Sequence, residues 1–456
     1  MSRPAHLRDK AVDQPRAAAR DTLRAIRERD AYANLVLPKL LRERQITGRD
    51  AALATELAYG TARATGILDQ IIASAADRPV ADIDGPVLDV LRLGSYQLLR
   101  TRIGAHAAVS TSVDLIRSEM GQGPAGFVNA VLRKVSQRDE ELWIDQLAPP
   151  IADDVIGHLA FQYAHPRWIA QVFSDALGGS AGQLQALLAA DDERPPVHLA
   201  ALPGMITAEE LALTSDGEVG TLSPYAVYLA GGDPGALEAV REGWARVQDE
   251  GSQLVARALS LAPTVGEDTG RWLDLCAGPG GKAAMLGALA DIAGARVDAV
   301  EIAEHRAELV RSAVRDLPVT VMVGDGRDPG LEPGFDRVLV DAPCTGLGSL
   351  RRRPEARWRR RPADVADLVV LQRELLTAAL GLARPGGVVA YSTCSPHLDE
   401  TRGVLDEVLA EHPAVELLDA RELVPAPDLG DGLTVQLWPH RHGTDAMFLA
   451  VLRRAV

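Results

Sequence analysis

The second half of this 456-residue chain alternates between short β-type runs and helical stretches, and this alternation is the strongest constraint on its fold. From Asp249 onward the β-type runs are RWLDL (271–275), RVDAVEI (296–302), VTVMVGD (319–325), FDRVLVD (335–341) and GGVVAYS (386–392). Strands separated by helices predict a parallel, doubly wound α/β sheet. The carboxyl ends of such strands converge on a ligand crevice.

The first part of the chain has a different pattern, in which apolar residues recur at helical spacing. One such face consists of Phe127, Val128, Val131, Leu132 and Val135. Glycine and proline residues divide this part into several short helices, and a proline-rich junction at 148–150 ends it. We therefore predict a multidomain chain with an all-α domain (14–147), a small α/β linking region (151–246) and a Rossmann-like α/β domain (247–456).

The chain has three cysteines, and each lies in a short loop directly after a predicted strand. These are Cys276, Cys344 and Cys394, in LDLCAGPGGK, VLVDAPCTG and VVAYSTCSP. Cysteines often serve as small buried apolar residues, but that role does not explain three of them at strand ends. Their spacing fits neither a metal clip nor a dense disulfide framework. We expect a cysteine nucleophile, no bound metal and a reducing, cytoplasmic compartment.

Charge is unevenly distributed along the chain. The formal net charge is −15, but residues 1–148 hold 21 Lys and Arg against 19 Asp and Glu. Inside the acidic remainder, seven arginines lie between Leu350 and Arg361. Such a run is often a solvated helix face, but its place after the Cys344 loop favours a phosphate-contacting rim. No stretch is apolar enough to span a membrane, and the N-terminus lacks the apolar core of a signal peptide.

A glycine-rich loop follows the first predicted strand and opens a helix. It consists of Cys276, Ala277, Gly278, Pro279, Gly280, Gly281 and Lys282. Glu301 ends the next strand, where an acid accepts hydrogen bonds from ribose hydroxyls, and Asp325 ends the third. Either acid alone can be a helix N-cap or a solvated loop residue. Together, without a pyrophosphate-binding motif, they favour a nucleoside ligand such as S-adenosylmethionine.

Two of the cysteines lie at the ends of neighbouring strands, in Asp341-Ala-Pro-Cys344 and Ser392-Thr-Cys394-Ser. We expect their thiols to face each other across one pocket. A nucleophilic thiolate needs an electropositive or base-assisted setting, for which the arginine run and strand-end dipoles are candidates. Carbon 6 of a pyrimidine suits such a pair, because thiolate addition there activates carbon 5 toward a methyl donor. Asp341 is placed to bond the N3 edge of the ring.

Five motifs resemble, in order and spacing, those of the RsmB/Sun-type RNA cytosine-5 methyltransferases. They are LDLCAGPGGK, VGDGR, VLVDAPCTGLGSLRRRPE, VAYSTCSP and VQDEGSQL. The resemblance implies that Cys394 is the nucleophile, that Cys344 assists product release and that the loop 276–282 binds S-adenosylmethionine. It also implies a ribose contact for Glu301 and further cofactor contacts for Asp325 and Asp341. Lys282 would help to orient the cytosine. Arg351, Arg352 and Arg353 would contact RNA, as would the linking region (151–246).

The N-terminal part resembles the NusB-type helical RNA-binding domain that bacterial members of this family carry. The resemblance rests on ATELAYGTARATGILDQII, VLRLGSYQLL, IGAHAAVSTSVDLI and GFVNAVLRKV. Two stretches depart from the family pattern: Asp445-Ala446-Met447-Phe448 replaces Asp-Gly-Phe-Phe, and His397-Leu398-Asp399-Glu400-Thr401 replaces an acidic-Asn-Glu stretch. We expect both to lie outside the methyl-transfer core and to affect pocket-wall packing or RNA selectivity.

The function expected from these features is methylation of carbon 5 of a cytosine in 16S ribosomal RNA by a monomer. The target base would have to leave its stack to reach both thiols. A transfer-RNA methyltransferase is the nearest alternative. A non-catalytic ribosome-assembly factor would not need Cys344, Cys394, Asp341 and Lys282. A DNA cytosine methyltransferase would instead use the cysteine of its Pro-Cys motif as the nucleophile.

Overall fold

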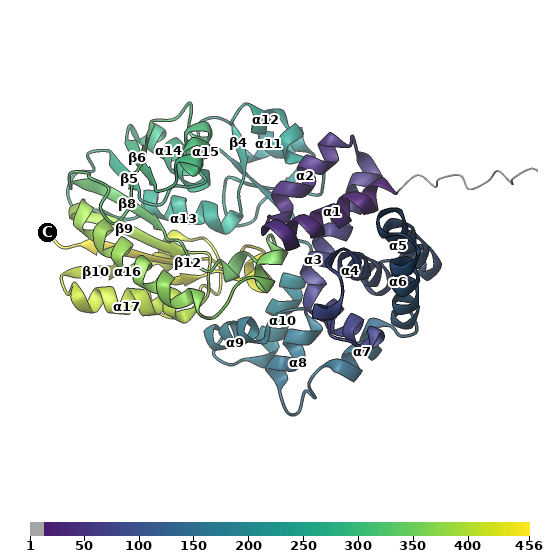
Figure 1. Cartoon of the computed structure of the whole chain (residues 1–456). Helices are drawn as coiled ribbons and strands as arrows, with labels where there is room; N and C mark the ends of the chain where they lie inside the picture. Colours follow the sequence, from purple (N-terminus) through teal and green to yellow (C-terminus); the bar gives the residue numbers. More distant parts are fainter. Residues whose placement is uncertain (1–12) are drawn as a thin grey trace, which may run out of the picture. The chain divides into compact units, whose positions relative to one another are not determined.

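The computed structural model describes residues 13–456, and they form two compact units (Figure 1). The helical unit comprises the described residues up to Gln171, together with Asp192–Arg194 and Leu350–Arg359. The sheet unit comprises Val172–Asp191, Pro195–Ser349 and Arg360–Val456. The region predicted as a separate linker, 151–246, thus divides between the two units. Among the described residues, no helix has the length and hydropathy needed to cross a membrane.

The helical unit confirms the all-α region. Its principal helices are α1 (Gln14–Arg29), α2 (Ala33–Glu43), α3 (Gly48–Ala76), α4 (Gly85–Arg100), α5 (Ala105–Met120), α6 (Gln122–Val135), α7 (Glu140–Leu147) and α8 (Val155–Gln162). The apolar face predicted from 127 to 135 lies on α6, where four of its five residues are buried and Phe127 packs against the same core. α1 begins where the Asp13 carboxylate accepts the backbone N–H of Arg16.

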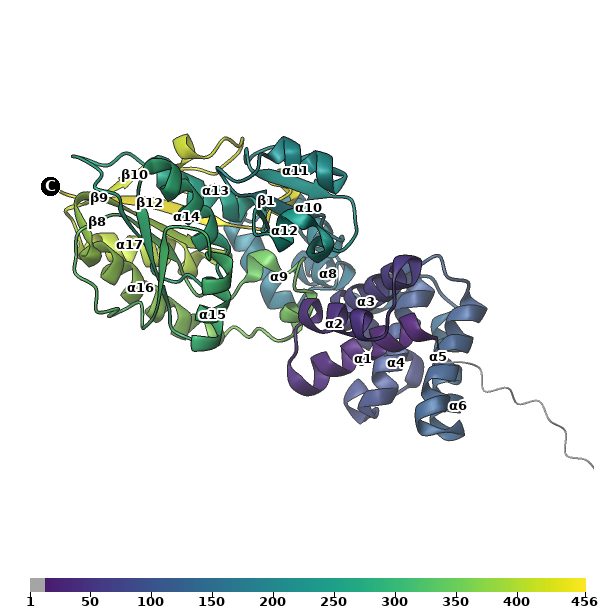
Figure 2. The ribbon, with the colours of Figure 1, turned by 90° about the horizontal axis from the view of Figure 1, so that it is seen from above.

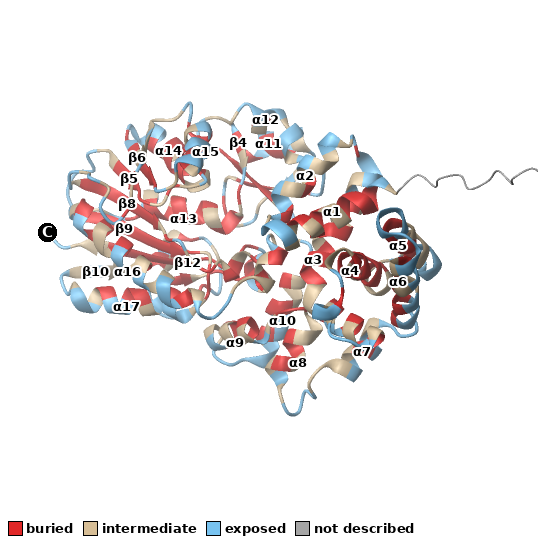
Figure 3. Cartoon of the chain, in the orientation of Figure 1, coloured by how far each residue is buried: buried red, intermediate tan, exposed pale blue. Residues whose placement is uncertain are grey.

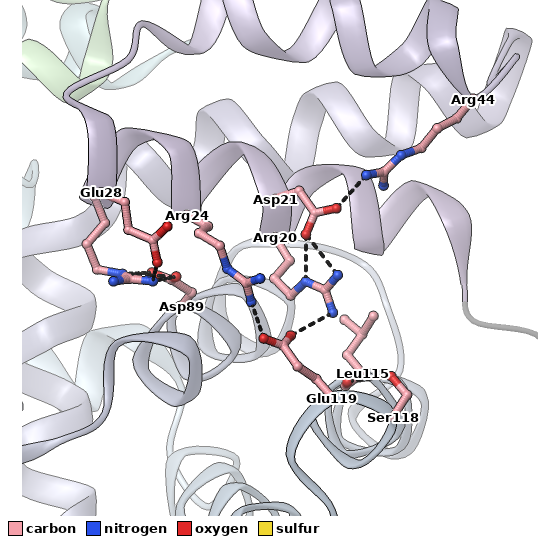
Figure 4. A network of polar contacts seen from close by, with 10 residues as sticks. Arg20, Asp21, Arg24, Glu28, Arg44, Asp89, Leu115, Ser118 and Glu119 are labelled. Carbon is pink, nitrogen blue, oxygen red and sulfur yellow. Dashed lines mark hydrogen bonds and ion pairs between the residues drawn. The ribbon is translucent and has the colours of Figure 1, made fainter.

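Ion pairs connect α1 to neighbouring helices of this unit (Figure 4). Arg20 and Arg24 both contact Glu119 on α5, at 3.2 and 2.5 Å. Arg27 lies 2.9 Å from Asp89 on α4. Burial raises the pKa of Asp89, and its hydrogen bonds with Arg27 act in the opposite direction. The Arg27 guanidinium therefore compensates a carboxylate that would otherwise be costly to bury.

The arginine-rich run is divided between exposed and buried side chains. Leu350–Arg359, here called the arginine strap, belongs to the helical unit. Arg351 is 4% exposed and Arg357 is fully buried, whereas Arg353 is exposed with its guanidinium over the ring of Tyr32. Arg351 is thus less accessible to a phosphate than Arg352 and Arg353, and its contact with RNA stays a prediction. Contacts of Arg352 and Arg353 with RNA stay a prediction.

Backbone groups of the helical unit hold the strap. Trp358 Nε1 donates to the carbonyl of Ala62 on α3 at 3.1 Å, and the Glu355 carboxylate accepts the N–H of Ala33 at the start of α2 at 3.2 Å. The Trp358 ring lies against α3 at Gly66, where a Cβ would come within 2.1 Å of the ring. A residue without a side chain at position 66 is therefore what lets the strap pack on α3.

We expect Gly66→Ala to destabilise the helical unit, because the added methyl group overlaps the Trp358 ring. Overpacking of this kind costs about 1–3 kcal/mol. The matched control is Gly126→Ala inside α6, where a Cβ meets open space and alanine is favoured over glycine by about 1 kcal/mol. Urea unfolding should shift in opposite directions for the two variants. A Gly66→Ala protein as stable as Gly126→Ala would contradict the packing of the strap on α3.

The sheet unit begins with a small antiparallel sheet. Its strands are β1 (Val197–Ala201), β2 (Gly217–Val219), β3 (Ala226–Leu229) and β4 (Ala245–Val247), in the order β2-β3-β1-β4. α11 (Ala208–Ser215) and α12 (Glu238–Arg241) contact this sheet, and α9 (Arg167–Ala176) and α10 (Ala181–Asp192) precede it in the chain. α11 starts with a capping box, because Thr207 and Glu210 each bond the other's backbone N–H. The sequence had indicated short strands here without fixing their bounds.

All five predicted parallel strands are present in the large sheet. They are β5 (Arg271–Asp274), β6 (Arg296–Glu301), β7 (Val319–Val323), β8 (Phe335–Asp341) and β9 (Ala383–Thr393), in the order β9-β8-β5-β6-β7. Three antiparallel strands that the sequence did not predict extend the sheet beyond β9: β10 (Val415–Leu418), β11 (Val435–Gln436) and β12 (Phe448–Arg454). Chain order reverses between β8 and β5, which is where a ligand crevice is expected.

Helices cover both faces of the large sheet (Figures 1 and 2). α13 (Glu250–Leu261) and α14 (Gly281–Ala293) pack on one face, with α15 (Glu304–Ala313) beside α14, and α16 (Asp364–Leu382) and α17 (Arg402–Glu411) pack on the other. On β9, Val388 and Ala390 join the α13 cluster, whereas Val389 and Tyr391 join the α16 cluster. Figure 3 shows the strands buried between these helical layers. Their carboxyl ends therefore emerge at one edge, where the loops carry the polar residues.

Candidate active site

Three loops at the ends of neighbouring strands form the candidate active site. β9, β8 and β5 are adjacent in the sheet, and each is followed closely by one cysteine. Cys344 Sγ and Cys394 Sγ lie 3.4 Å apart, so the predicted facing of these two thiols is confirmed. All three cysteines are free thiols. Two thiols are therefore available to act on one ligand atom.

The surroundings of the thiols distinguish them. The hydrogen bond with Cys394, together with burial, raises the pKa of Cys344 well above its usual value. Cys344 is thus a neutral thiol at neutral pH and can donate its proton to a neighbouring thiolate. Burial, followed by the charge of Asp274, raises the pKa of Cys276. The third thiol is therefore not an activated nucleophile.

An ion pair lies at the same strand ends. Lys282 in the first turn of α14 places Nζ 2.8 Å from Oδ2 of Asp341 at the end of β8. The other Asp341 oxygen accepts the hydroxyl of Ser392 at 3.0 Å. Burial opposes the charge on Lys282, but the charges of Asp341 and then of Cys394 raise its pKa on balance. A persistent ammonium therefore interacts with Cys394, in the role that the sequence had given to the arginine run.

Glu400 is a fully buried carboxylate that connects the two cysteine loops. Its Oε1 accepts the backbone N–H of Thr345 at 2.7 Å and the side-chain amide of Gln372 at 3.1 Å. Its Oε2 accepts the hydroxyls of Thr345 and Ser395. Thr345 follows one cysteine and Ser395 follows the other. The expectation that this stretch lies outside the methyl-transfer core is therefore corrected for Glu400.

The glycine-rich loop wraps around the carboxylate at the end of β6. Glu301 is 4% exposed, and its oxygens accept the N–H groups of Gly278 at 3.1 Å and Ala303 at 3.0 Å. A Cβ on Gly278 would lie 2.1 Å from the Glu301 carboxylate, so this close approach requires glycine. Arg306 donates to the Gly278 carbonyl at 2.6 Å. The carboxylate keeps further lone pairs for hydroxyl donors, which suits a ribose.

Asp325 pairs with Arg327 in the sheet unit. Arg327 donates to both of its oxygens, and these hydrogen bonds lower the pKa of Asp325. Asp325 also lines a cavity of about 710 Å³ together with residues of α16. The structure therefore does not bring it into the hydrogen-bond network of Gly278 and Glu301. Its contact with a cofactor stays a prediction.

Comparison with known proteins gives the family of the chain. The sequence model of the 16S rRNA methyltransferase RsmB/F family matches residues 258–453, and that of the NusB family matches residues 13–137. The ribosomal RNA small subunit methyltransferase B of Klebsiella pneumoniae is 33% identical over 435 residues, which cover 91% of this chain and 96% of that one. The chain belongs to the RsmB/F family of 16S rRNA methyltransferases. A candidate methyltransferase of Mycobacterium tuberculosis H37Rv is 63% identical over 449 residues, 98% of each chain.

Solved structures support the RsmB/F-type fold. The crystal structure of PH0851 covers 100% of both chains with a TM-score of 0.80 at 22% identity. The structure of NSun6 from Pyrococcus horikoshii with the ligand SFG covers 64% of this chain and 98% of that one, with a TM-score of 0.54 at 18% identity. At these identities the likeness concerns the fold alone. It agrees with a helical NusB-like region followed by an α/β methyltransferase domain.

One departure from the RsmB/F pattern contacts the cysteine loops through its backbone. The N–H of Ala446 donates to the carbonyl of Gly348 at 2.9 Å, and the N–H of Gly348 donates to the carbonyl of Cys394 at 2.9 Å. A Cβ on Gly348 would lie 2.1 Å from the Ala446 carbonyl oxygen. Asp445 and Met447 on either side are buried. The departure therefore forms part of the wall behind Cys394, as expected from the sequence.

In an RsmB/F-family chain, Glu301→Ala is expected to weaken binding of S-adenosylmethionine. The change removes the acceptor for ribose hydroxyls and for the loop N–H of Gly278, a loss of about 1–3 kcal/mol in binding free energy. Isothermal titration calorimetry should therefore show an affinity lower by about 5- to 150-fold. Glu304→Ala on exposed α15, with 66% side-chain exposure, is the control and should bind normally. Unchanged affinity of the Glu301→Ala variant for S-adenosylmethionine would show that Glu301 does not contact the cofactor.

Proposed function

We propose that this chain transfers the methyl group of S-adenosylmethionine to carbon 5 of a cytosine in 16S rRNA through a covalent adduct with Cys394. The observation that carries the proposal is the 3.4 Å separation of Cys344 and Cys394. Attack alone needs one thiol, so a second thiol at this distance suits a cycle with a separate release step. The family supplies the substrate class, since its members methylate 16S rRNA.

The loop at the end of β5 is the proposed cofactor site. Its residues are Cys276, Ala277, Gly278, Pro279, Gly280, Gly281 and Lys282, with Glu301 on the ribose and Asp325 and Asp341 as further contacts. Support comes from the close approach of Gly278 to the Glu301 carboxylate, which shapes a backbone turn around an acceptor. S-adenosylmethionine supplies an electrophilic methyl group on sulfonium sulfur.

The cycle begins with attack on carbon 6. The Cys394 thiolate forms a bond to carbon 6, and the π electrons of the carbon 5–carbon 6 bond make carbon 5 nucleophilic. Lys282 stabilises the thiolate, and the Lys282–Asp341 pair contacts the N3 edge and stabilises negative charge placed on the ring. Carbon 5 then bonds to the methyl carbon, while the bond from that carbon to sulfur breaks and leaves its electron pair on the sulfur as a neutral thioether. The base must be flipped out of its stack for these contacts to form.

Release regenerates the Cys394 thiolate. A base removes the remaining proton from carbon 5, the carbon 6–sulfur bond breaks, and its electrons return to the Cys394 sulfur. Cys344 lies 3.4 Å from that sulfur as a neutral thiol, because its hydrogen bond and burial raise its pKa. It can therefore donate a hydrogen bond to the thiolate as the thiolate forms. This is the proposed role of Cys344 in product release.

Bisulfite sequencing tests the proposal. Purified protein, S-adenosylmethionine and unmodified 16S rRNA should yield a cytosine that resists deamination, and the Cys394→Ala protein should yield none. Ribosomal and transfer RNA from a strain lacking the gene should lose the same mark in 16S rRNA alone. Loss of the mark from transfer RNA instead would show that transfer RNA is the substrate. A lack of 5-methylcytosine in both RNAs would contradict the proposed reaction.

A further inference from the structure

A second pocket, of about 310 Å³, lies in the sheet unit between the small antiparallel sheet and α15. Its walls come from the end of α12, the start of β4 and the C-terminal end of α15. Ala313, the last residue of α15, lines the pocket and also packs on the glycine-rich loop, because a Cβ on Gly280 would lie 2.6 Å from the Ala313 Cβ. The residues that line the pocket include none of the cysteine site and none of the loop 276–282. Its volume is at the lower end of the range for small-ligand sites.

Arginine side chains without carboxylate partners line this pocket. They are Arg241, Arg246 and Arg315, and within residues 13–456 none of them forms an ion pair. Arg246 donates through one Nη to the carbonyl of Ala313, while its buried Nε has no hydrogen-bond partner in the described part of the chain. Arg246 is half-buried, so its unpaired charge is unfavourable unless an anion compensates it, whereas Arg241 and Arg315 are exposed to solvent.

Neighbouring charges strengthen this argument. Burial, and then the nearby charge of Arg315, lower the pKa of Arg246. Both side chains line the same pocket, so their positive charges oppose each other there. Glu242 and Asp316 also line the pocket, but both are exposed and neither is paired with these arginines. A phosphate between Arg246 and Arg315 would replace this repulsion with two attractive contacts.

An aromatic ring completes the pocket. Trp244 is 42% exposed, although it stands directly before a strand whose first residue, Ala245, is fully buried. An exposed indole beside cationic groups is the arrangement with which proteins hold single-stranded nucleic acid, because bases stack on the ring while phosphates contact the charges. Neither feature alone would specify a ligand. Together they select a ligand that carries both a flat ring and a phosphate.

We propose that this pocket binds one nucleotide of a single-stranded segment of the RNA substrate, with the base on Trp244 and the phosphate between Arg246 and Arg315. The proposal rests on the RNA substrate proposed above and adds a second contact point for it. Outside residues 1–148 the chain holds 27 Lys and Arg against 44 Asp and Glu, so most of it repels phosphate. The pocket holds the strand at the half-buried Arg246, whose Nε has no partner among the described residues, with Arg241 and Arg315 beside it.

Fluorescence anisotropy of a labelled single-stranded 12-mer oligoribonucleotide on the full-length protein tests this. Trp244→Ala should weaken binding by about 5- to 150-fold, the usual effect of removing one stacking ring. Arg315→Ala should lower the slope of log affinity against log salt by about 0.7, the value for one phosphate contact in a single strand. Arg315 is exposed, so this variant is expected to fold normally.

Matched controls come from the same unit. Arg311→Ala removes another arginine of α15, one that is paired with Glu304 and Glu308. Leu213→Ala removes an apolar side chain of α11 that is 85% exposed. Both should bind the oligonucleotide as the unmodified protein does. Trp244→Ala and Arg315→Ala proteins that also bind normally would overturn the proposal, as would a failure of the unmodified protein to bind.

Two further measurements separate the possible outcomes. Uridine monophosphate should compete only weakly, whereas equal competition by this mononucleotide and the 12-mer would assign the pocket to a free nucleotide and overturn the RNA contact. Bisulfite sequencing of 16S rRNA treated with each variant separates the pocket from the reaction. If the variants methylate 16S rRNA normally and also bind the oligonucleotide normally, the pocket is not an RNA site, and the proposed function stands. If the unmodified protein does not methylate 16S rRNA, the proposed function is wrong.

Discussion

The Cys344→Ala protein is expected to remain covalently attached to its RNA. Cys394 can still attack carbon 6 and carbon 5 can still be methylated, but the thiol 3.4 Å from the leaving sulfur is gone, so elimination slows. A denaturing gel should show a retarded band for this variant. Cys394→Ala should show no band and a loss of methyl transfer of about 10⁴-fold or more, because removing a covalent nucleophile abolishes the activated intermediate.

Two controls make this experiment decisive. The Cys344→Ala/Cys394→Ala double variant should lose the retarded band, which places the adduct on Cys394. Cys276→Ala should form no stable adduct, because burial and Asp274 keep that thiol protonated and unable to attack the base. A band that persists in Cys394→Ala and disappears in Cys344→Ala would reverse the two roles, as in a DNA-type cytosine methyltransferase.

Replacing Glu400 with Ala is expected to reduce methyl transfer by about 10²-fold, with little change in affinity for S-adenosylmethionine. The carboxylate is the shared acceptor for Thr345 and Ser395 in the two cysteine loops. Without it, buried donors lose their partner and the two sulfur atoms are no longer held at 3.4 Å. Single-turnover methyl transfer and calorimetric cofactor binding should separate these effects.

Conservative and surface variants test the role of Glu400. Glu400→Gln keeps one carbonyl acceptor, and the hydroxyls of Thr345 and Ser395 can turn to accept from its amide, so partial activity should return. Glu407→Ala on α17 removes a glutamate with 53% side-chain exposure and one ion pair with Arg373. That control should retain activity. An active Glu400→Ala protein would show that other contacts fix the cysteine loops.

The sequence predicts those parts of the structure that follow from local pattern. The β-type runs of the large sheet are short, mostly apolar and largely separated by helical stretches, and all five form strands. The ends of β8 and β9 carry Cys344 and Cys394, and strand-end convergence alone brings them together. The position of Lys282 near Asp341 also follows from strand order, because Lys282 comes after β5, which is next to β8 in the sheet.

The remaining features depend on contacts between distant residues. The antiparallel β12 is an almost continuous apolar run, whose direction in the sheet no local pattern specifies. Glu400 stands in a polar stretch, and its importance arises from Thr345, 55 positions earlier. Burial of Arg351 and Arg357 contradicts the general tendency of arginine to be exposed, and the acceptor for Arg357 is the carbonyl of Ala164, 193 positions earlier.

The arginine strap also affects the order in which the protein can fold during synthesis. The helical unit contains the N-terminal helices and Leu350–Arg359, so its last piece leaves the ribosome long after its first. Until then, α3 lacks the Trp358 ring at Gly66, and the N–H of Ala33 lacks its carboxylate acceptor. The nascent N-terminal helices therefore lack these contacts until a segment encoded about 200 codons downstream of α7 has been synthesised. An isolated fragment of residues 14–147 would display this incomplete surface permanently.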